Sequence, residues 1–355
     1  MTPKVHVLLV SAQAAPNLLP ALDPAIKPTH VVLLTSSKMR HQGTALYSVL
    51  KESGITVQSV ELPNEHDLAQ IEEIVLAIAS EHLSEDIAFN LTGGTKLMAL
   101  AAQNVANTAG CRTFYVDVDT DEIIWLDRAD DNHKLTATLR LKHYLQSYGF
   151  SISAKQHPAN PPSYQALQTT LVRNARTFER TLGELNFIAQ TAEDRNSLHV
   201  RLDDKQLDSR SLEALMRHFE DAGVLTLEAD RLVFANEDAR FFCKGGWLEH
   251  HVFQTLNAVQ ARLDIRDKAS NLVVEDRDGV RNELDVAFMA RNRLFVIECK
   301  TARMDRAGST KANDTLFKLS ENCRRVGGLG SRGMLASFRK LNAPELKLAR
   351  PQNIH

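Results

Sequence analysis

The chain has 355 residues, with 42 basic side chains, 44 acidic side chains, 13 His, 4 Cys and a formal net charge of −2. Apolar residues make up 43% and charged residues 24%, an ordinary globular composition that excludes wholesale disorder and, at this length, predicts roughly two to three domains. No stretch approaches the roughly 18 consecutive apolar residues of a membrane helix, and the scattered cysteines favour a reducing compartment. We therefore expect a cytoplasmic protein with no membrane partner.

The first part of the chain alternates short β-rich runs with helical stretches. This alternation predicts right-handed βαβ units and a mainly parallel sheet in this part of the chain. The predicted strands are Lys4–Val10, Val31–Thr35, Thr56–Leu62, Ile87–Leu91, Arg112–Asp117 and Glu122–Asp127. The predicted helices are Gly43–Ser53, Glu65–Leu83 and Thr95–Asn107.

The middle of the chain is predicted to be mostly helical. A proline-rich segment, Gln156–Ser163, separates it from the first part. An amphipathic helix at Ser209–Ala222, followed by β-rich runs on either side of Glu228–Asp230, is typical of a winged helix. Residues 201–230 hold eight acidic and four basic side chains, which disfavours DNA recognition because a groove-binding helix needs a positive surface. We expect residues 136–240 to form a helical, winged-helix-like linker domain.

The strongest local signal lies in the apolar run Phe295–Thr301. The two-residue period of a strand places Glu298 and Lys300 on one face. A preceding strand carries Asp285, and a tight connection at Ala290–Arg293 makes the two strands neighbours. These three side chains are therefore expected to converge at one edge of a sheet. A structural ion pair between Glu298 and Lys300 is the alternative interpretation.

Such a convergence suits metal-dependent hydrolysis of phosphodiesters. Asp285 and Glu298 offer the carboxylate oxygens that Mg²⁺ or Mn²⁺ binds, and the backbone carbonyl of Cys299 is a further candidate ligand. Lys300 is expected to orient the attacking water or to stabilise the charge that grows on the phosphate. Glu249, on a predicted helix upstream, is expected to support the site or to add a ligand.

A second signal is the segment Asn90–Lys96, which follows a predicted strand and opens a predicted helix. The adjacent Gly93 and Gly94 allow backbone N–H groups to approach an anion at the helix N-terminus. It is neither a Walker A loop nor a dinucleotide fingerprint. The neighbouring donors are Thr92, Thr95 and Lys96. Small polar residues also follow two other strands of this part, and these are Ser11, Gln13, Ser36 and Lys38. Because ligands gather at the carboxyl edge of parallel sheets, we expect a phosphate-bearing ligand there.

Two resemblances follow from these motifs. Glu283–Asp285 together with Glu298–Lys300 resembles the PD-(D/E)xK nuclease superfamily, without the proline before the aspartate. The Gly93–Lys96 turn and its surroundings resemble the CRISPR-associated Rossmann fold, abbreviated CARF. The chain as a whole is similar to the CARF–nuclease effectors of type III CRISPR systems. The resemblance implies a CARF domain over 1–135 and a restriction-endonuclease-like α/β domain over 241–355.

The resemblance also implies ligands and partners. It implies a homodimer that binds cyclic oligoadenylate, most often cyclic tetra-adenylate, across the paired CARF domains. It implies cleavage of single-stranded RNA, single-stranded DNA or plasmid DNA with Mn²⁺ or Mg²⁺. The preferred nucleic acid, the ring size of the activator, and whether the CARF domain degrades its ligand stay open. So does the way in which ligand binding is coupled to the nuclease site.

Two other functions remain as alternatives. One is a CARF-type winged-helix transcription regulator whose C-terminal fold has lost its chemistry, and the other is a repair or restriction endonuclease that needs no messenger. The distribution of charge bears on both. Residues 291–355 hold 14 basic and 5 acidic side chains, a net of +9, so the remaining residues hold 28 and 39, a net of −11. The basic end lies directly downstream of Glu298 and Lys300, where a phosphate backbone is expected to bind.

Overall fold

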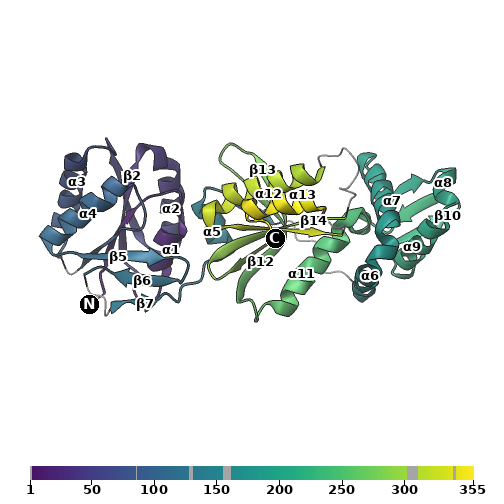
Figure 1. Ribbon diagram of the computed structural model, residues 1–355, viewed down its shortest axis with the longest axis horizontal. Coiled ribbons are helices and arrows are strands. Elements are labelled where there is room, and N and C mark those ends of the chain that lie inside the picture. The colour runs from purple at the N-terminus through teal and green to yellow at the C-terminus, as the bar shows by residue number, and fades with distance from the viewer. Residues whose placement is uncertain (1, 85, 128–130, 155–160, 302–310, 339–340) are drawn as a thin grey trace.

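The computed structural model describes residues 2–84, 86–127, 131–154, 161–301, 311–338 and 341–355. Three bodies lie in a row (Figure 1). The N-terminal α/β unit is at one end, a unit built mainly from the C-terminal residues is in the middle, and the helical unit is at the other end, although in sequence it lies between the other two. The predicted mixed α/β fold class is confirmed. Most of the predicted boundary segment Gln156–Ser163 lies outside the described residues.

The N-terminal unit is a seven-stranded sheet in the order β3-β2-β1-β4-β5-β6-β7, parallel from β3 to β5 and antiparallel beyond. Its strands are β1 (Val5–Leu9), β2 (His30–Ser36), β3 (Thr56–Leu62), β4 (Ile87–Asn90), β5 (Arg112–Asp117), β6 (Glu122–Trp125) and β7 (His133–Lys134). Its helices are α1 (Ala15–Leu22), the short η1 (Ser37–Met39), α2 (Arg40–Glu52), α3 (Leu68–Ser80) and α4 (Lys96–Ala109). The six predicted strands and three predicted helices are present, with ends that differ by a few residues.

Alternation along β1 explains why helices cover both faces of this sheet. Val7 and Leu9 pack in the core formed with α3 and α4, whereas Leu8 and Val10 pack in the core formed with α1 and α2. Every residue of β1 is buried, as expected for the central strand of a parallel sheet. Helix α1 escaped prediction because two prolines, Pro16 and Pro20, interrupt its pattern.

The middle body is a five-stranded sheet in the order β15-β14-β13-β12-β8. Its strands are β8 (Ser151–Ala154), β12 (Ile265–Glu275), β13 (Arg281–Ala290), β14 (Arg293–Lys300) and β15 (Arg332–Ser337). Its helices are α5 (Leu141–Ser147), α11 (Trp247–Val259), α12 (Lys311–Gly327), η4 (Gly328–Gly330), α13 (Ala343–Ala349) and η5 (Arg350–Gln352). Strand β8 pairs with β12, so a segment that the sequence placed in the linker domain adds an edge strand to this sheet. The division at residues 136 and 240 otherwise stays a prediction.

The helical unit contains a small sheet in the order β10-β11-β9. Its elements are α6 (Pro162–Arg173), α7 (Ala175–Asp194), β9 (His199–Arg201), α8 (Asp204–Leu207), α9 (Arg210–Asp221), β10 (Leu225–Glu228), β11 (Arg231–Phe234), α10 (Glu237–Phe241) and the π-helical turn η3 (Phe242–Gly246). Helix α9 forms because Ser209 caps its first turn, four apolar side chains share its buried face, and Gly223 follows it at φ 74°. The hairpin β10–β11 lies where the sequence predicts it.

The N-terminal unit and the middle body share one apolar core. The cluster that holds Leu8 and Leu46 continues through Leu139 and Leu145 to Val296. The four cysteines are free and buried. Across the described part of the chain, no helix combines the length and the apolar character that crossing a bilayer requires.

The connection between these two bodies depends on Asp23, whose carboxylate is fully buried at the end of α1. It accepts hydrogen bonds from the backbone N–H groups of Ala25 at 2.9 Å, Thr136 at 2.5 Å and Ala137 at 2.9 Å. Asp23→Ala is expected to leave these donors without a partner and to lower the free energy of unfolding of the N-terminal unit by about 2 kcal/mol or more. Thermal unfolding followed by circular dichroism measures this loss.

The matched control is Glu73→Ala, which removes an exposed carboxylate from α3 of the same unit. Its melting temperature should equal that of the parent protein. Equal melting temperatures for both variants would contradict the role given to Asp23.

Candidate nuclease active site

Two neighbouring strands bring the predicted acidic and basic side chains together. Strands β13 and β14 pair antiparallel with Val286 opposite Ile297, so the next position outward places Asp285 opposite Glu298. The Lys300 Nζ lies 2.5 Å from Oε1 of Glu298 and 3.9 Å from Oδ2 of Asp285. The structure thus gathers these three side chains at one end of the hairpin.

The carboxylates of this cluster are more buried than its ammonium group. The side chains of Asp285 and Glu298 are 16% and 12% exposed, whereas Lys300 is 34% exposed. Oδ2 of Asp285 also accepts a 2.7 Å hydrogen bond from the backbone N–H of Cys299. That bond fixes one carboxylate oxygen of Asp285 beside the backbone of β14.

Glu249 joins the cluster from the first turn of α11. Its Oε2 is buried and has no hydrogen-bond partner in the described part of the chain. Burial, followed by the negative charges of Asp285 and Glu283, raises the pKa of Glu249 to about 9. Glu249 is therefore protonated at neutral pH unless a cation approaches it.

The other two groups show the same electrostatic conflict. Burial, followed by the charge of Glu298, raises the pKa of Asp285 to about 6. Burial lowers the pKa of Lys300, but the carboxylates of Glu298 and Asp285 outweigh it, so the pKa rises overall and the ammonium stays charged. The site concentrates negative charge that one lysine only partly neutralises.

A tight turn and a hydrogen bond from the helical unit hold the strand end and α11 in place. Gly245, in the π-helical turn η3 before α11, has φ 133°, and a Cβ there would lie 2.5 Å from Oγ1 of Thr301. Thr301 follows Lys300 directly, and its hydroxyl is 2.6 Å from the side-chain amide of the buried Asn186 on α7. A side chain of the helical unit thus contacts the residue next to the cluster.

The donor set fits a hard divalent cation. It consists of carboxylate oxygens whose charged form is disfavoured by burial and by neighbouring carboxylates, and it includes the unpartnered Oε2 of Glu249. Within the described ranges, no three His, Cys, Asp or Glu side chains are close enough to form a complete metal centre. An ion here would complete its coordination with water, as Mg²⁺ commonly does, and with a backbone carbonyl such as that of Cys299.

Two further residues lie near this cluster and were not among the predicted site residues. Glu283 lies two positions before Asp285 and raises its pKa, a proximity that the two-residue period of the strand could have revealed. Asn271, which the register of β12 and β13 places opposite Asp285, is buried at φ 50° with an unpartnered Oδ1 in the described structure. A positive φ inside a strand leaves no sequence signal beyond the low β-propensity of asparagine.

The predicted phosphate-binding turn lies between β4 and α4. A Cβ at Gly93 would lie 2.1 Å from the carbonyl oxygen of Leu9, and Gly94 has φ 73°, so both positions require glycine. Thr95 caps α4 and accepts a hydrogen bond from the N–H of Met98 at 3.2 Å. Lys96 begins the helix with an exposed side chain. The local geometry is that of an anion site at a helix N-terminus.

Several other predicted ligand contacts already have partners within the chain. The Thr92 hydroxyl donates to Oδ1 of Asn90 at 2.7 Å and accepts from the N–H of Val116 at 2.7 Å. The Ser11 hydroxyl lies next to the turn and donates to the carbonyl of Gln13 at 3.2 Å. The Gln13 side chain points instead to the middle body, where it accepts a 3.3 Å hydrogen bond from Tyr148.

Ser36 and Lys38 share an acidic partner, Glu65. Nζ of Lys38 lies 2.6 Å from Oε1 of Glu65, and Lys38, followed by the hydroxyl of Ser36, lowers the pKa of that carboxyl. A phosphate that binds Lys38 must therefore compete with Glu65. The structure places both residues at the carboxyl end of β2, as predicted.

Comparison with known protein families identifies both ends of the chain. Residues 5–144 match the Card1 CARF domain, and residues 236–354 match the Card1-like endonuclease domain. The chain belongs to the CARF-domain endonucleases. The N-terminal unit is hereafter called the CARF domain, and the middle body the endonuclease domain.

Solved structures resemble the chain over its full length. Protein VC1899 from Vibrio cholerae is 28% identical with a TM-score of 0.88, covering 99% of this chain and 92% of that one. Can2 from Sulfobacillus thermosulfidooxidans, in complex with cyclic tetra-adenylate, is 27% identical with a TM-score of 0.84, covering 99% and 94%. A type III CRISPR defence DNA nuclease activated by cyclic oligoadenylate, 18% identical with a TM-score of 0.58 and covering 99% and 52%, shares the fold. No curated protein sequence matches the chain.

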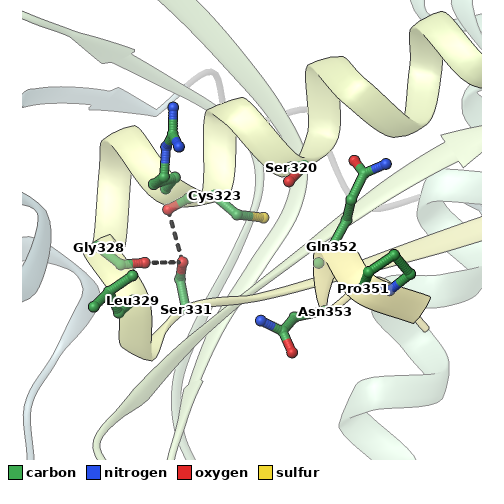
Figure 2. Close-up of a pocket in the computed structure, with 10 residues that line it drawn as sticks. Ser320, Cys323, Gly328, Leu329, Ser331, Pro351, Gln352 and Asn353 are labelled. Atoms are coloured by element: carbon green, nitrogen blue, oxygen red, sulfur yellow. Dashed lines mark hydrogen bonds between the residues drawn. The ribbon is translucent and has the colours of Figure 1, made fainter. Parts of the chain in front are cut away.

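A separate pocket of about 190 Å³ lies between the end of α12, the start of β15 and η5 (Figure 2). Ser331 lies on its wall and donates hydrogen bonds to the carbonyls of Cys323 at 2.7 Å and Gly328 at 2.9 Å. None of the carboxylates of the candidate active site lines this pocket. A Cβ at Gly328 would lie 2.7 Å from the side chain of Gln13, so the pocket adjoins the contact between the two domains.

The structure describes only part of the basic segment 291–355. Arg303, Arg306, Arg339 and Lys340 lie outside the described residues. On α12, Arg325 pairs with Asp276 at 2.7 Å, while Lys318 is exposed. Binding of a phosphate backbone along this segment stays a prediction.

The electrostatic conflict in the site predicts an unusual stability effect. Asp285→Asn is expected to raise the melting temperature in EDTA at about pH 8, because its folded pKa of about 6 exceeds its ordinary value of 3.8. The stability that protonated Asp285 provides is present below the ordinary pKa and is lost as the pH rises through the folded pKa. The gain from the substitution should therefore be small at about pH 4 and largest at about pH 8.

Thermal unfolding at both pH values measures the effect. Asp278→Asn is the control, because this exposed carboxylate lies on the turn between β12 and β13. It should change the melting temperature at neither pH. A lower melting temperature for Asp285→Asn at the higher pH would contradict the assigned repulsion.

Proposed function

We propose that this CARF-domain endonuclease is a metal-dependent phosphodiesterase that cleaves RNA or DNA and is activated by cyclic oligoadenylate, with cyclic tetra-adenylate as the first candidate. Its role is antiviral defence in a type III CRISPR system. The observation that carries the proposal is the convergence of Asp285, Glu298, Lys300 and Glu249 in an endonuclease domain joined to a CARF domain.

The acidic residues are proposed to hold the metal ion. Asp285 and Glu298 are the first ligands, with the backbone carbonyl of Cys299 beside them and Glu249 as the supporting carboxylate. A bound Mn²⁺ or Mg²⁺ polarises the phosphate and acidifies a water molecule. The raised pKa values of Glu249 and Asp285 support this assignment, because a cation stabilises the charged carboxylates that burial and neighbouring negative charge disfavour.

Lys300 is proposed to act as a charged hydrogen-bond donor. Its raised pKa keeps the ammonium protonated at neutral pH, which excludes a role as general base in this charge state. At 2.5 Å from Glu298, Nζ lies beside the proposed ligands, where it can orient the attacking water and stabilise negative charge on the phosphate.

The CARF domain is proposed to bind cyclic oligoadenylate through Gly93, Gly94, Thr95 and Lys96. Can2, whose structure was solved with cyclic tetra-adenylate, matches nearly the full length of the chain and supports this ligand class. Ser11, Gln13, Ser36, Lys38 and Thr92 are proposed as a surrounding set. Thr92 acts mainly by shaping the turn, because its hydroxyl is bonded to Asn90 and Val116.

A homodimer is part of the proposal. On the CARF domain, Leu68 and Leu76 of α3 and Leu100 of α4 are exposed. Glu72 lies one helical turn from each of the first two and accepts a 2.8 Å hydrogen bond from Asn104, which lies one turn from Leu100. These leucines therefore share one face, and exposed apolar faces of this kind often mark contacts between proteins.

The two alternatives predict different behaviour. A transcription regulator without nuclease chemistry fits poorly with the endonuclease-family match and with the intact acidic cluster. A messenger-independent endonuclease would cleave equally well with and without cyclic oligoadenylate. A cleavage assay on labelled single-stranded RNA, single-stranded DNA and plasmid therefore separates all three functions.

The central prediction concerns the nuclease residues. With Mn²⁺ and cyclic tetra-adenylate, Glu298→Ala and Lys300→Ala should each lower the cleavage rate by about a hundredfold or more, because each removes a charge that acts on the transition state. Glu275→Ala is the control, since it removes an exposed ion pair with Arg281 from the same sheet. Cleavage by both site variants at the parent rate would overturn the site assignment.

A further prediction concerns the sensor. Lys96→Ala should weaken binding of cyclic tetra-adenylate by about tenfold and make it less sensitive to salt, because it removes one cation from the proposed phosphate site. Isothermal titration calorimetry at two salt concentrations measures both effects. Lys134→Ala, an exposed lysine on β7, is the control. Equal affinity for Lys96→Ala and the parent protein would remove Lys96 from the ligand site.

A further inference from the structure

Two tight turns from different domains meet between the CARF sheet and the endonuclease sheet. The turn between β13 and β14 contains Arg291 and Asn292, both at positive φ, and it is followed by Arg293. It lies against the turn between β5 and β6 of the CARF domain, where Arg293 forms an ion pair with Asp119. The contact joins residues that lie 174 positions apart in the sequence.

Asn292 is the centre of this contact. Its Oδ1 accepts a 2.9 Å hydrogen bond from the N–H of Leu139, and its Nδ2 donates to the carbonyl of Ala137 at 3.1 Å. The Asn292 side chain also lies close enough to Asp121 of the β5–β6 turn to lower the pKa of that carboxyl, which burial raises overall. The side chain of Asn292 thus connects the β13–β14 hairpin, called the catalytic hairpin below, to the segment Ala137–Leu139 between the two domains and to the CARF sheet.

The β5–β6 turn is itself attached to the proposed ligand site. Thr92, directly before Gly93, accepts a 2.7 Å hydrogen bond from the N–H of Val116 on β5. Val116 lies three positions before Asp119 along the chain. A change in the turn that binds phosphate therefore reaches the β5–β6 turn through one hydrogen bond and one short stretch of strand.

On the other side of the contact, the β13–β14 hairpin leads to the catalytic cluster. Glu298 lies on the same strand as Arg293, about 17 Å away along an extended strand. The two strands are paired from Ala290 and Arg293 to Val286 and Ile297, and both are buried over most of that length. Such a hairpin moves as one piece, so a shift at its turn changes the position of Asp285 and Glu298.

We propose that Asn292 is a positioning residue that, together with the ion pair between Arg293 and Asp119, transmits ligand binding in the CARF domain to the catalytic hairpin. This inference rests on the proposed function, because it concerns how that function is regulated. The contact between the β5–β6 and β13–β14 turns would then carry the effect of ligand binding, through residues that contact neither the ligand nor the nucleic acid.

The first test uses Asn292→Gly in the full-length protein, since glycine tolerates φ 55° while losing the amide hydrogen bonds. The variant should bind cyclic tetra-adenylate with unchanged affinity, retain its basal cleavage of plasmid with Mn²⁺, and lose roughly tenfold of the stimulation by the ligand. Its melting temperature should fall modestly, because the backbone groups of Leu139 and Ala137 each lose a partner, so the assays are run well below that temperature. Asn196→Gly, at φ 49° in an exposed turn of the helical unit, is the matched control and should be stimulated like the parent protein.

A charge exchange tests the ion pair separately. Asp119→Arg and Arg293→Asp alone should each reduce the stimulation a few-fold, and the double variant should recover it. Recovery shows that the ion pair itself carries the effect, and equal melting temperatures for the two single variants, the double variant and the parent protein separate transmission from a loss of stability. Asp119 is largely exposed, so its substitution leaves the fold intact.

The possible outcomes separate the two proposals. If cyclic tetra-adenylate stimulates the parent protein and Asn292→Gly equally, the transmission through Asn292 is wrong while the proposed function stands. If the parent protein cleaves plasmid but responds to none of the cyclic oligoadenylates, the proposed regulation fails, and the role of Asn292 fails with it. Loss of ligand affinity or of basal cleavage in Asn292→Gly would also overturn the proposal, since it would show that the substitution disturbs one of the two domains rather than the signal between them.

Discussion

Mutual repulsion among partly buried carboxylates is the constraint on which the rest of the endonuclease domain depends. Asp285, Glu298 and Glu249 come from two strands and one helix. Burial, followed by the charge of neighbouring carboxylates, raises the pKa of Glu249 and of Asp285. Without other interactions, partly buried carboxylates would move apart or become hydrated. The strand pairing, the Cys299 N–H bond to Asp285 and the Lys300 ion pair keep them together. Stability lost here is the physical basis of a site that attracts cations.

That constraint gives the helical unit a role that its charge alone does not suggest. The acidic composition of residues 201–230 disfavours DNA recognition, yet Asn186 on α7 hydrogen-bonds to Thr301 directly after Lys300. The same unit leads through η3 into α11, which carries Glu249. Lys244 of η3 pairs with Glu193 of α7 at 2.7 Å, so the turn is held on both sides. The helical unit therefore holds in place the strand end that carries Lys300 and the helix that carries Glu249.

Elements and site residues could be predicted from the sequence where the local hydrophobic pattern and the residue chemistry indicate the same structure. The β13–β14 hairpin could be predicted because alternation, apolar content and a short connection all indicate two paired strands. The register of that pairing alone places Asp285 beside Glu298. Partners from distant segments could not be predicted. Nothing local links Lys38 to Glu65 or turns Gln13 toward Tyr148, and β8 joins the endonuclease sheet only through long-range pairing with β12. Tertiary contacts, not residue types, decide which predicted ligand contacts are free to bind.

The same repulsion makes the affinity of the site for a cation depend steeply on the distance between its carboxylates. Two unit charges about 4 Å apart interact by about 4 kcal/mol at an effective dielectric constant near 20, and moving them about 1 Å farther apart changes this by about 0.8 kcal/mol. That is roughly a fourfold change in an equilibrium constant for an ion that binds between them. Asn292 holds the turn of the β13–β14 hairpin, and the charged side chains lie at the opposite end of its strands. A small displacement of the turn therefore changes the binding constant of a cation at that end. A flexible linker between the domains would absorb the same displacement, whereas the shared core through Leu139 and Leu145 does not.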